Sequence, residues 1–450
     1  MVVVFALVAL LAVSVLVAAN WYVWRRLFRD TTRGPGPVRR IGAVVIAGGW
    51  ALAVGALVAE RTGAPFWLQR VLAWPGFLWL ALSIYLLLAV LAGEVVRPLL
   101  RRLPARRAAA RETEAVRPEN APEEAPKPPA PERIPAGTAP PRTPVPEPQP
   151  EPDPQPEAVP VPDGPPDATP ESPLAVPSRR LFVSRVVAGA AAAAAVGTVG
   201  YGTYGVLSGP KVKRVTVPLA KLPRAAHGFR IAVVSDIHLG PVLGRGFAQK
   251  VVDTVNSTQP DLIAVVGDLV DGSVKDLGPA AAPLARLKAR HGAYFVTGNH
   301  EYFSGAEQWV AEVRRLGLLP LENARTELPH FDLAGVNDVA GEDEGQGPDY
   351  EKALGDRDRS RACVLLAHQP VQIHDAVDHG VDLQLSGHTH GGQLWPGNLI
   401  AGAANPTLAG LERYGDTQLY VSRGAGAWGP PTRVGAPSDI TVIELASRQA

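Results

Sequence analysis

Five short polar motifs in the second half of the 450-residue chain carry side chains that can bind metal ions. Their donors are carboxylates, an amide and imidazoles. Such a mixture suits Mn²⁺, Fe or Zn²⁺ better than Ca²⁺ or an ion selected by thiolates. The motifs therefore predict a metal site, and the candidate ligands are Asp236, His238, Asp268, Asn299, His368, His388 and His390.

The spacing within the motifs indicates which donors can share an ion. Asp236 and His238 are two residues apart, so both side chains leave the same face of an extended backbone. His388 and His390 are spaced in the same way and can serve different ions of a pair. Asp268 offers two carboxylate oxygens, which can bridge two ions about 3.5 to 4 Å apart. The pattern is typical of a centre with two metals.

The elements that must position these side chains are short buried strands. An apolar run precedes every motif, within residues 229–236, 261–268, 293–300, 363–370 and 382–390. Helical patterns fall between them, over residues 246–257, 280–290, 306–316 and 371–379. This alternation predicts an α/β domain built in layers. Because ligands bind beyond the carboxyl ends of such strands, we expect the motifs to meet there.

Taken in order, the motifs D-x-H, G-D-x-x-D, G-N-H-E, a lone histidine and G-H-T-H resemble the calcineurin-like metallophosphoesterase superfamily, especially its membrane-associated bacterial branch. The resemblance extends from Arg230 to Leu445. It implies a layered β-sheet sandwich flanked by helices, and hydrolysis of phosphate esters by a hydroxide bridging two divalent ions. It also implies that one ion is held by Asp236, His238, Asp268 and His390, and the other by Asp268, Asn299, His368 and His388.

Four further residues are candidates for catalytic, supporting or substrate-binding roles next to the metals. His300 follows Asn299 and is not among the ligands, so we expect it to protonate the leaving oxygen or stabilise the transition state. The resemblance implies the same role. We expect Asp271 to orient one of the metal-binding side chains rather than to bind a metal itself. Tyr302 and Arg423 are weaker candidates for contact with the substrate phosphate, and a structural salt bridge is an equal alternative for Arg423.

The predicted function is hydrolysis of a phosphomonoester or phosphodiester, with a lipid-linked substrate as a narrower version. The alternative is a non-enzymatic, membrane-anchored module that binds metal and recruits partners. Trp395, Trp428 and the Gly/Pro-rich segments around residues 395–405 and 424–437 permit two interpretations, a lipid-facing rim or ordinary capping loops. The formal net charge of +1 gives no bulk attraction to nucleic acid, so no nucleic-acid partner is expected. The single cysteine, Cys363, excludes an intrachain disulfide.

The first 111 residues have the composition of a membrane region. Apolar spans over residues 1–19, 41–59 and 71–96 each approach the roughly 20 residues that cross a bilayer. The first span is predicted to be a retained helix rather than a cleaved signal, because it lacks a basic segment at its start. Arginines crowd the loop after span one and the segment after span three, which predicts that both are cytoplasmic. They include Arg25, Arg26, Arg29, Arg101, Arg102 and Arg106.

Residues 112–177 are rich in Pro, Glu and Ala and predict a disordered linker. Residues 178–208 follow, with Arg179 and Arg180 before a mildly apolar Ala/Gly-rich stretch. This segment resembles a twin-arginine export signal, with the export machinery as its partner, and an ordinary fourth transmembrane helix is the alternative. Either interpretation makes the chain a multi-pass protein of the cell membrane. Both place the catalytic domain, residues 209–450, on the extracytoplasmic face.

Overall fold

The computed structural model describes residues 2–115 and 179–448, with side chains over residues 6–99 and 180–448. Contacts group Met1–Pro98 with Arg180–Ala450 in one unit and assign Leu99–Arg179 to a second. In the second unit, the described residues continue a helix as far as Ala115. The predicted linker over residues 112–177 therefore lies almost entirely outside the described residues.

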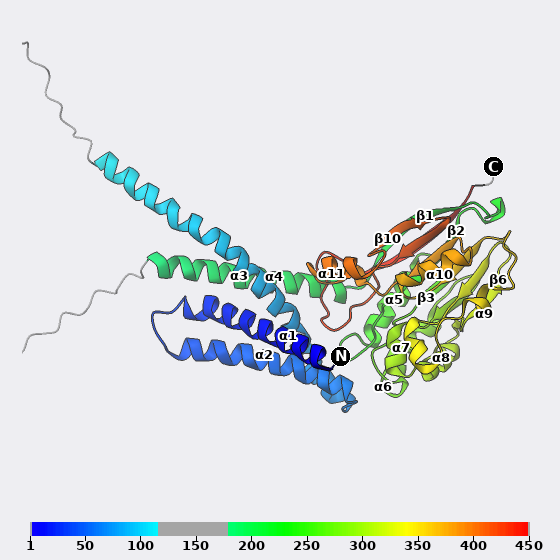
Figure 1. Ribbon diagram of the computed structural model, residues 1–450, viewed down its shortest axis with the longest axis horizontal. Helices are drawn as coiled ribbons and strands as arrows, with labels where there is room; N and C mark the ends of the chain where they lie inside the picture. The colour runs from blue at the N-terminus through cyan, green and yellow to red at the C-terminus, as the bar shows by residue number, and fades with distance from the viewer. Residues whose placement is uncertain (1, 116–178, 449–450) are drawn as a thin grey trace, which may run out of the picture. The chain divides into compact units, whose positions relative to one another are not determined.

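Four helices in the described part of the chain are long and apolar enough to cross a membrane. They are α1 (Val2–Trp24), which a π-helical turn η1 (Arg25–Arg29) continues, α2 (Pro37–Arg61), α3 (Phe66–Ala115) and α4 (Arg179–Leu207) (Figure 1). Arg26 donates from Nη2 to Glu94 Oε2 of α3 at 2.8 Å. This ion pair links the end of α1 to α3. The predicted apolar helices ahead of the catalytic domain are confirmed.

Two six-stranded sheets form the C-terminal domain. The first has the order β1 (Lys211–Leu219), β12 (Asp439–Ser447), β2 (Phe229–Val234), β3 (Leu262–Val266), β4 (Ala293–Val296) and β5 (Leu319–Pro320). The second has the order β10 (Gly410–Tyr414), β11 (Thr417–Val421), β9 (Leu383–Ser386), β8 (Cys363–Leu366), β7 (Asp332–Gly335) and β6 (Ala324–Glu327). Strands β2, β3 and β4 are parallel, as are β7, β8 and β9, so their carboxyl ends are aligned within each sheet.

The two sheets pack face to face, and helices cover their outer faces. In β2, Ile231 and Val233 enter the core between the sheets, whereas Ala232 and Val234 enter the core beneath the helices. Burial on both faces explains why these strands are continuously apolar. The first sheet is covered by α5 (Arg245–Ser257), α6 (Val274–Ala281) and α8 (Ala306–Arg315), and the second by α9 (Tyr350–Leu354) and α10 (Ile373–Asp378). The predicted α/β sandwich is therefore confirmed.

Short helical segments complete the domain near the strand ends. They are η2 (Arg224–Ala226), η3 (Ala282–Arg286), α7 (Asn299–Ser304), η4 (Val339–Glu344), η5 (Pro370–Gln372), η6 (His390–Gly392) and α11 (Gly397–Ala404). Two of them, α7 and η6, begin at predicted site residues.

The predicted helix over residues 280–290 is wrong in its bounds. Helix α6 begins earlier because Ser273 caps it, with Ser273 Oγ accepting from the Asp276 N–H at 3.3 Å. The chain then tightens into η3 at Ala282, where Pro283 cannot donate the backbone hydrogen bond that an α-helix needs. Leu287 is already extended, so the helical segment ends before residue 290.

Candidate metal centre

The carboxyl ends of β2, β3, β8 and β9 bring together two groups of metal-binding side chains. One group contains Asp236, His238 and His390, and the other contains Asp268, His368 and His388. Within each group, one ligand atom from every residue lies within 4.8 Å of the others. A third set of three, His238, Asp268 and His300, overlaps the first two groups. The predicted ligands thus meet where the strands end.

In the first group, two imidazole nitrogens point at the same space. His238 Nε2 and His390 Nε2 are 3.0 Å apart, and His390 Nε2 is 3.3 Å from Asp236 Oδ1. All three residues are buried. Two histidine nitrogens and a carboxylate that converge in this way match the donor set of a transition-metal ion.

The Asp268 carboxylate belongs to the second group and also faces the first. Asp268 Oδ2 lies 3.1 Å from His368 Nε2 and 3.7 Å from His238 Nε2, so one oxygen faces a histidine of each group. Asn299 Oδ1 lies 3.1 Å from His388 Nδ1. His368 Nε2 is buried and faces Asp268 Oδ2 without meeting hydrogen-bond geometry. Buried imidazole, carboxylate and amide donors that converge in this way match the donor set of divalent metal ions, so the residues fit a metal pair.

The backbone is strained at these positions. Positive φ angles occur at Asp236 (52°), His238 (48°), Asp268 (52°), His388 (71°) and His390 (53°). Residues other than glycine rarely adopt this conformation, and it persists only where surrounding contacts enforce it. Here the Asp236 N–H donates to the Gly267 carbonyl, and the His238 N–H to the Asp268 carbonyl, each at 3.1 Å. The strain therefore serves to aim ligand side chains into the centre.

Charges in the cluster shift the pKa values of its side chains in both directions. Burial alone would lower the pKa values of His368 and His238, but the nearby carboxylates of Asp268 and Asp271 raise them. Burial alone would raise the pKa of Asp268, but His368 and His238 hold the pKa of this carboxyl well below its ordinary value. Burial and the neighbouring His368 lower the pKa of His388 to about 4. The shared carboxylate is therefore ionised and His388 is neutral near pH 7, which are the forms that bind metals.

His300 and Asp271 lie beside the two groups. Asp271 Oδ1 is 2.7 Å from His300 Nδ1 and 3.0 Å from His238 Nδ1, so one carboxylate orients both rings. Burial would lower the pKa of His300, but its hydrogen bond to Asp271 and the nearby negative charges raise that pKa to about 9. Asp271 occupies Nδ1, which leaves Nε2 of His300 as the atom able to reach a substrate.

Comparison with known proteins identifies the family to which this fold and centre belong. The model of the calcineurin-like phosphoesterase family matches residues 229–392. An uncharacterized metallophosphoesterase of Aquifex aeolicus is 33% identical over 243 residues, which cover 53% of this chain and 92% of that protein. The chain belongs to the calcineurin-like metallophosphoesterase family.

Larger metallophosphoesterases also match this chain. A transmembrane protein with metallophosphoesterase domain of Danio rerio is 39% identical over 259 residues, 54% of this chain and 59% of the relative. An uncharacterized metallophosphoesterase of Helicobacter pylori strain J99 is 40% identical over 247 residues, 54% of this chain and 66% of the relative. The chain thus spans about three fifths to two thirds of these relatives. Its four apolar helices indicate that this metallophosphoesterase is a membrane protein.

Two residues that support the metallophosphoesterase centre were not predicted from the sequence. Glu301 is fully buried, and its carboxylate accepts from the backbone N–H groups of Asp268 (3.0 Å), Leu269 (2.7 Å) and Gly298 (2.6 Å). Arg433 is buried as well and donates from Nη1 to the His390 carbonyl at 3.0 Å. Glu301 could have been found from its place in the G-N-H-E motif. Arg433 follows His390 by 43 residues and carries no such signal.

The structure places the two weaker candidates differently. The Tyr302 hydroxyl donates to the Gln346 carbonyl at 3.3 Å and lies 3.3 Å from Thr297 Oγ1, so it is held by neighbouring loops. The side chain of Arg423 packs against Gly391, directly after the predicted ligand His390.

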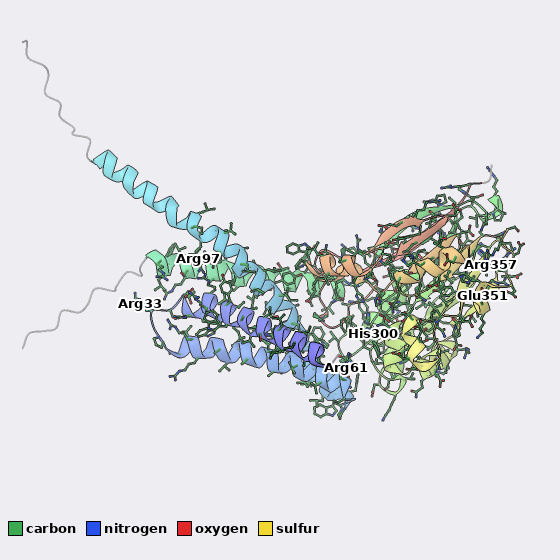
Figure 2. All side chains as sticks on the ribbon, viewed as in Figure 1. Arg33, Arg61, Arg97, His300, Glu351 and Arg357 are labelled. Atoms are coloured by element: carbon green, nitrogen blue, oxygen red, sulfur yellow. The ribbon has the colours of Figure 1, made fainter. Side chains whose placement is uncertain are left out.

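Two aromatic rings flank the predicted general acid. The Phe303 ring lies 5.5 Å from the His300 ring and the Trp428 ring lies 5.6 Å from it, both edge to face. Phe303 is 70% exposed and Trp428 is 52% exposed. Two aromatic rings therefore line His300, and the carboxyl of Glu60 from α2 is close enough to interact electrostatically with it. In Figure 2, His300 is well separated from Glu351 and Arg357, which belong to the part of the domain around α9.

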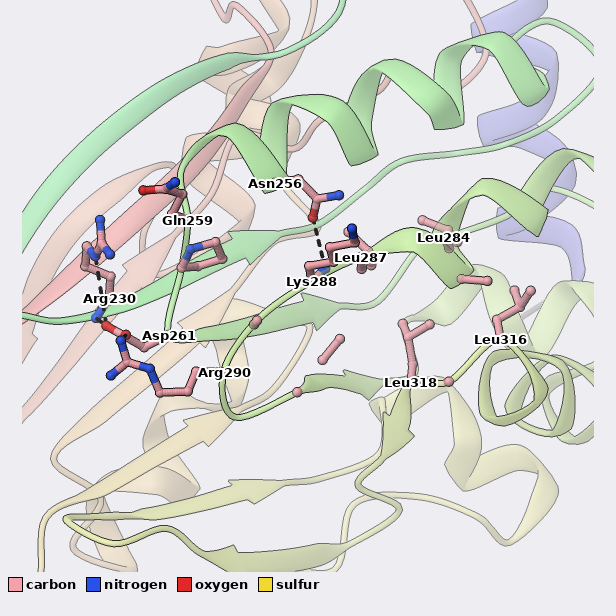
Figure 3. Close-up of a pocket in the computed structure, with 16 residues that line it drawn as sticks. Arg230, Asn256, Gln259, Asp261, Leu284, Leu287, Lys288, Arg290, Leu316 and Leu318 are labelled. Carbon is pink, nitrogen blue, oxygen red and sulfur yellow. Dashed lines mark hydrogen bonds and ion pairs between the residues drawn. The ribbon is translucent and has the colours of Figure 1, made fainter.

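A cleft of about 760 Å³ lies elsewhere in the domain. It is lined by residues that begin or precede the strands, including Arg230, Asp261 and Leu318 (Figure 3). Asp261 Oδ2 accepts from the Arg230 N–H at 2.8 Å. The cleft is thus at the amino ends of the strands, opposite the metal ligands, and contains none of them.

Proposed function

We propose that this chain is a two-metal phosphoesterase that hydrolyses phosphomonoesters or phosphodiesters at the extracytoplasmic face of a cell membrane. The observation that carries the proposal is the pair of donor groups that share Asp268, with Asp268 Oδ2 facing His368 Nε2 at 3.1 Å and His238 Nε2 at 3.7 Å. Two divalent ions such as Mn²⁺, Fe or Zn²⁺ would lower the pKa of a water they share and offset charge on the phosphoryl oxygens.

The chain's own residues supply the remaining steps. His300, held at Nδ1 by Asp271, delivers the proton at Nε2 to the leaving oxygen as the phosphorus–oxygen bond breaks. Asp271 also fixes the His238 ring. We assign to Arg423, whose aliphatic stem lies beside Gly391, the binding of a phosphoryl oxygen. Each residue acts in a centre that is ordered before substrate arrives, so little reorganisation is needed during the reaction.

The decisive test is to remove the shared carboxylate. Purified full-length protein with Mn²⁺ is expected to hydrolyse an aryl phosphate ester, and Asp268→Ala to abolish turnover and lower the bound metal measured by elemental analysis. His374→Ala changes an exposed histidine of α10 and is the matched control. Unchanged turnover in Asp268→Ala would refute the mechanism. Metal binding without turnover on monoesters and diesters would instead favour a non-enzymatic binding module.

Helix α4 supports the proposed extracytoplasmic placement. Arg179 and Arg180 begin this helix, and its apolar segment ends at Leu207, directly before the catalytic domain. With the arginine-rich loops inside, α4 crosses outward. Protease added to intact cells should cleave the catalytic domain, and complete protection would overturn the topology. If Arg179→Lys with Arg180→Lys keeps the domain inside, the export machinery that reads twin arginines inserts α4, whereas unchanged topology indicates an ordinary transmembrane helix.

A further inference from the structure

Two loop segments beside the metal centre are joined into one unit, which we call the rim and define as residues 393–404 and 428–435. The Trp395 N–H donates to the Val434 carbonyl at 2.9 Å, and the Val434 N–H donates to the Gln393 carbonyl at 2.8 Å. The side chain of Gln393 forms two more hydrogen bonds with the backbone of Trp428. Gln393 Nε2 donates to the Trp428 carbonyl at 2.9 Å, and the Trp428 N–H donates to Gln393 Oε1 at 3.1 Å. These bonds make the rim a single body.

One side of the rim borders the reaction site. Trp428 belongs to the rim, and its ring stands 5.6 Å from that of His300. Arg433 also belongs to the rim and holds the backbone carbonyl of the predicted ligand His390. A molecule lying on the rim near Trp428 is therefore next to the predicted general acid.

The other side of the rim contacts the membrane-spanning helices. The Tyr85 hydroxyl of α3 donates to the Trp395 carbonyl at 2.9 Å. Leu394 and Val434 pack against the cluster that contains Tyr85 and Ala195. These contacts lie within the unit formed by residues 1–98 and 180–450. The rim is thus continuous with a surface that a lipid bilayer surrounds.

The outer surface of the rim is apolar and uncharged. Leu399 is 68% exposed, Ile400 is 78% exposed and Trp395 is 51% exposed. All three lie in or beside α11, drawn in orange in Figure 1, and no residue of α11 is buried. Residues 393–410 contain no charged side chain. An exposed apolar helix next to membrane spans is the composition that inserts into the interfacial region of a bilayer, and tryptophan is enriched at that depth.

We propose that the rim is embedded in the bilayer and delivers a membrane lipid as the substrate, with the lipid's phosphate ester at the metal centre and its apolar part along Trp428 and Phe303. This step rests on the proposed function. In the reaction, the water oxygen forms a bond to phosphorus while the bond from phosphorus to the leaving oxygen breaks. His300 gives its proton to that oxygen, and the proton that the attacking water loses returns to His300 through solvent. One water is consumed and no oxidant or reductant is needed.

Insertion of the rim is tested without catalysis. The single native cysteine, Cys363, is buried and its pKa is raised to about 12 by burial, so a cysteine introduced by Ile400→Cys can be labelled selectively. A fluorophore at this position, in full-length protein in phosphatidylcholine–phosphatidylglycerol vesicles, should be quenched by nitroxide-labelled lipid and protected from iodide. Leu319→Cys, on the exposed edge strand β5, is the control and should behave in the opposite way. Quenching of the Ile400→Cys label by iodide alone would overturn insertion.

Substrate delivery is tested with two substrates in the same vesicles, a long-chain phosphatidic acid and a water-soluble aryl phosphate. The variant Leu399→Ser with Ile400→Ser should lower turnover of the lipid about tenfold or more and leave the soluble ester unchanged. Leu319→Ser should change neither rate. Equal losses on both substrates, or equal rates of the unmodified protein on both, would overturn lipid delivery. Hydrolysis of neither substrate, and of no bis-aryl phosphodiester either, by the unmodified protein would refute the proposed function itself, while the quenching result would still decide whether the rim inserts.

Discussion

The metal centre and the rim are neighbours in the catalytic domain, but they are built from opposite kinds of surface. In the metal centre, Asp236 and His368 are completely buried, and strained backbone and hydrogen bonds hold polar side chains in place. In the rim, Leu399 and Ile400 are apolar and open to the surroundings. Buried polar groups must be satisfied by each other or by an ion, whereas exposed apolar groups are stabilised by an apolar partner outside the protein. The comparison indicates that the metal centre carries out the reaction, whereas the rim controls which substrates reach it.

Removal of the metals should have the largest effect and should affect only one of the two regions. Dialysis against a strong chelator is expected to reduce turnover about a thousandfold or more, because the metals supply the nucleophile and offset phosphoryl charge. Elemental analysis should show the metal lost, and added Mn²⁺ should restore both metal and activity. The fluorescence of the labelled Ile400→Cys rim should not change. Loss of lipid quenching after chelation would show that the centre and the rim are not independent.

His300→Gln should give the next largest effect. The substitution removes a proton donor but no predicted ligand, so turnover is expected to fall about a hundredfold to ten-thousandfold. Metal content should stay at the level of the unmodified protein, as judged by elemental analysis. A parallel loss of metal would assign His300 to the ligands, which the overlapping group with His238 and Asp268 makes a real alternative.

Glu301→Gln tests the buried support beneath the centre. The carboxylate accepts three backbone N–H groups, and the amide keeps one acceptor oxygen. The free energy of unfolding should fall by about 1 to 3 kcal/mol, because buried donors lose their partners. Denaturant unfolding in detergent micelles measures this change. Glu307→Gln, in the first turn of α8, is the control, and an equal destabilisation there would remove the special role of Glu301.

Trp428→Ala should have the smallest effect on hydrolysis of a soluble substrate. The variant therefore separates the contribution of the rim from that of the metal centre. Turnover of a water-soluble aryl phosphate is expected to stay within about threefold, because the indole contacts the His300 ring but donates no ligand or proton. The KM for phosphatidic acid should rise more than the KM for the soluble ester. A large fall in kcat for the soluble ester would show that Trp428 helps to position His300.

The sequence was sufficient for the parts of the protein that depend on local patterns. Apolar runs identified the strands that end two residues before Asp236, Asp268 and His388, because burial on both faces of a strand demands continuous apolar residues. Long apolar spans likewise identified the four apolar helices. Local patterns located the helix over residues 280–290 less well, since the cap at Ser273 and the turn at Pro283 set its true bounds.

Only the tertiary structure decided which distant side chains meet. Asp236 and His390 come from strands of different sheets, and their contact depends on how the two sheets pack. The same holds for Asp271, which touches both His238 and His300, and for the pairing of Trp395 with Val434 that makes the rim one body. The order of residues along the chain encodes which face of each element is buried. It does not encode distances across the core, because those are set by the packing of all the layers together.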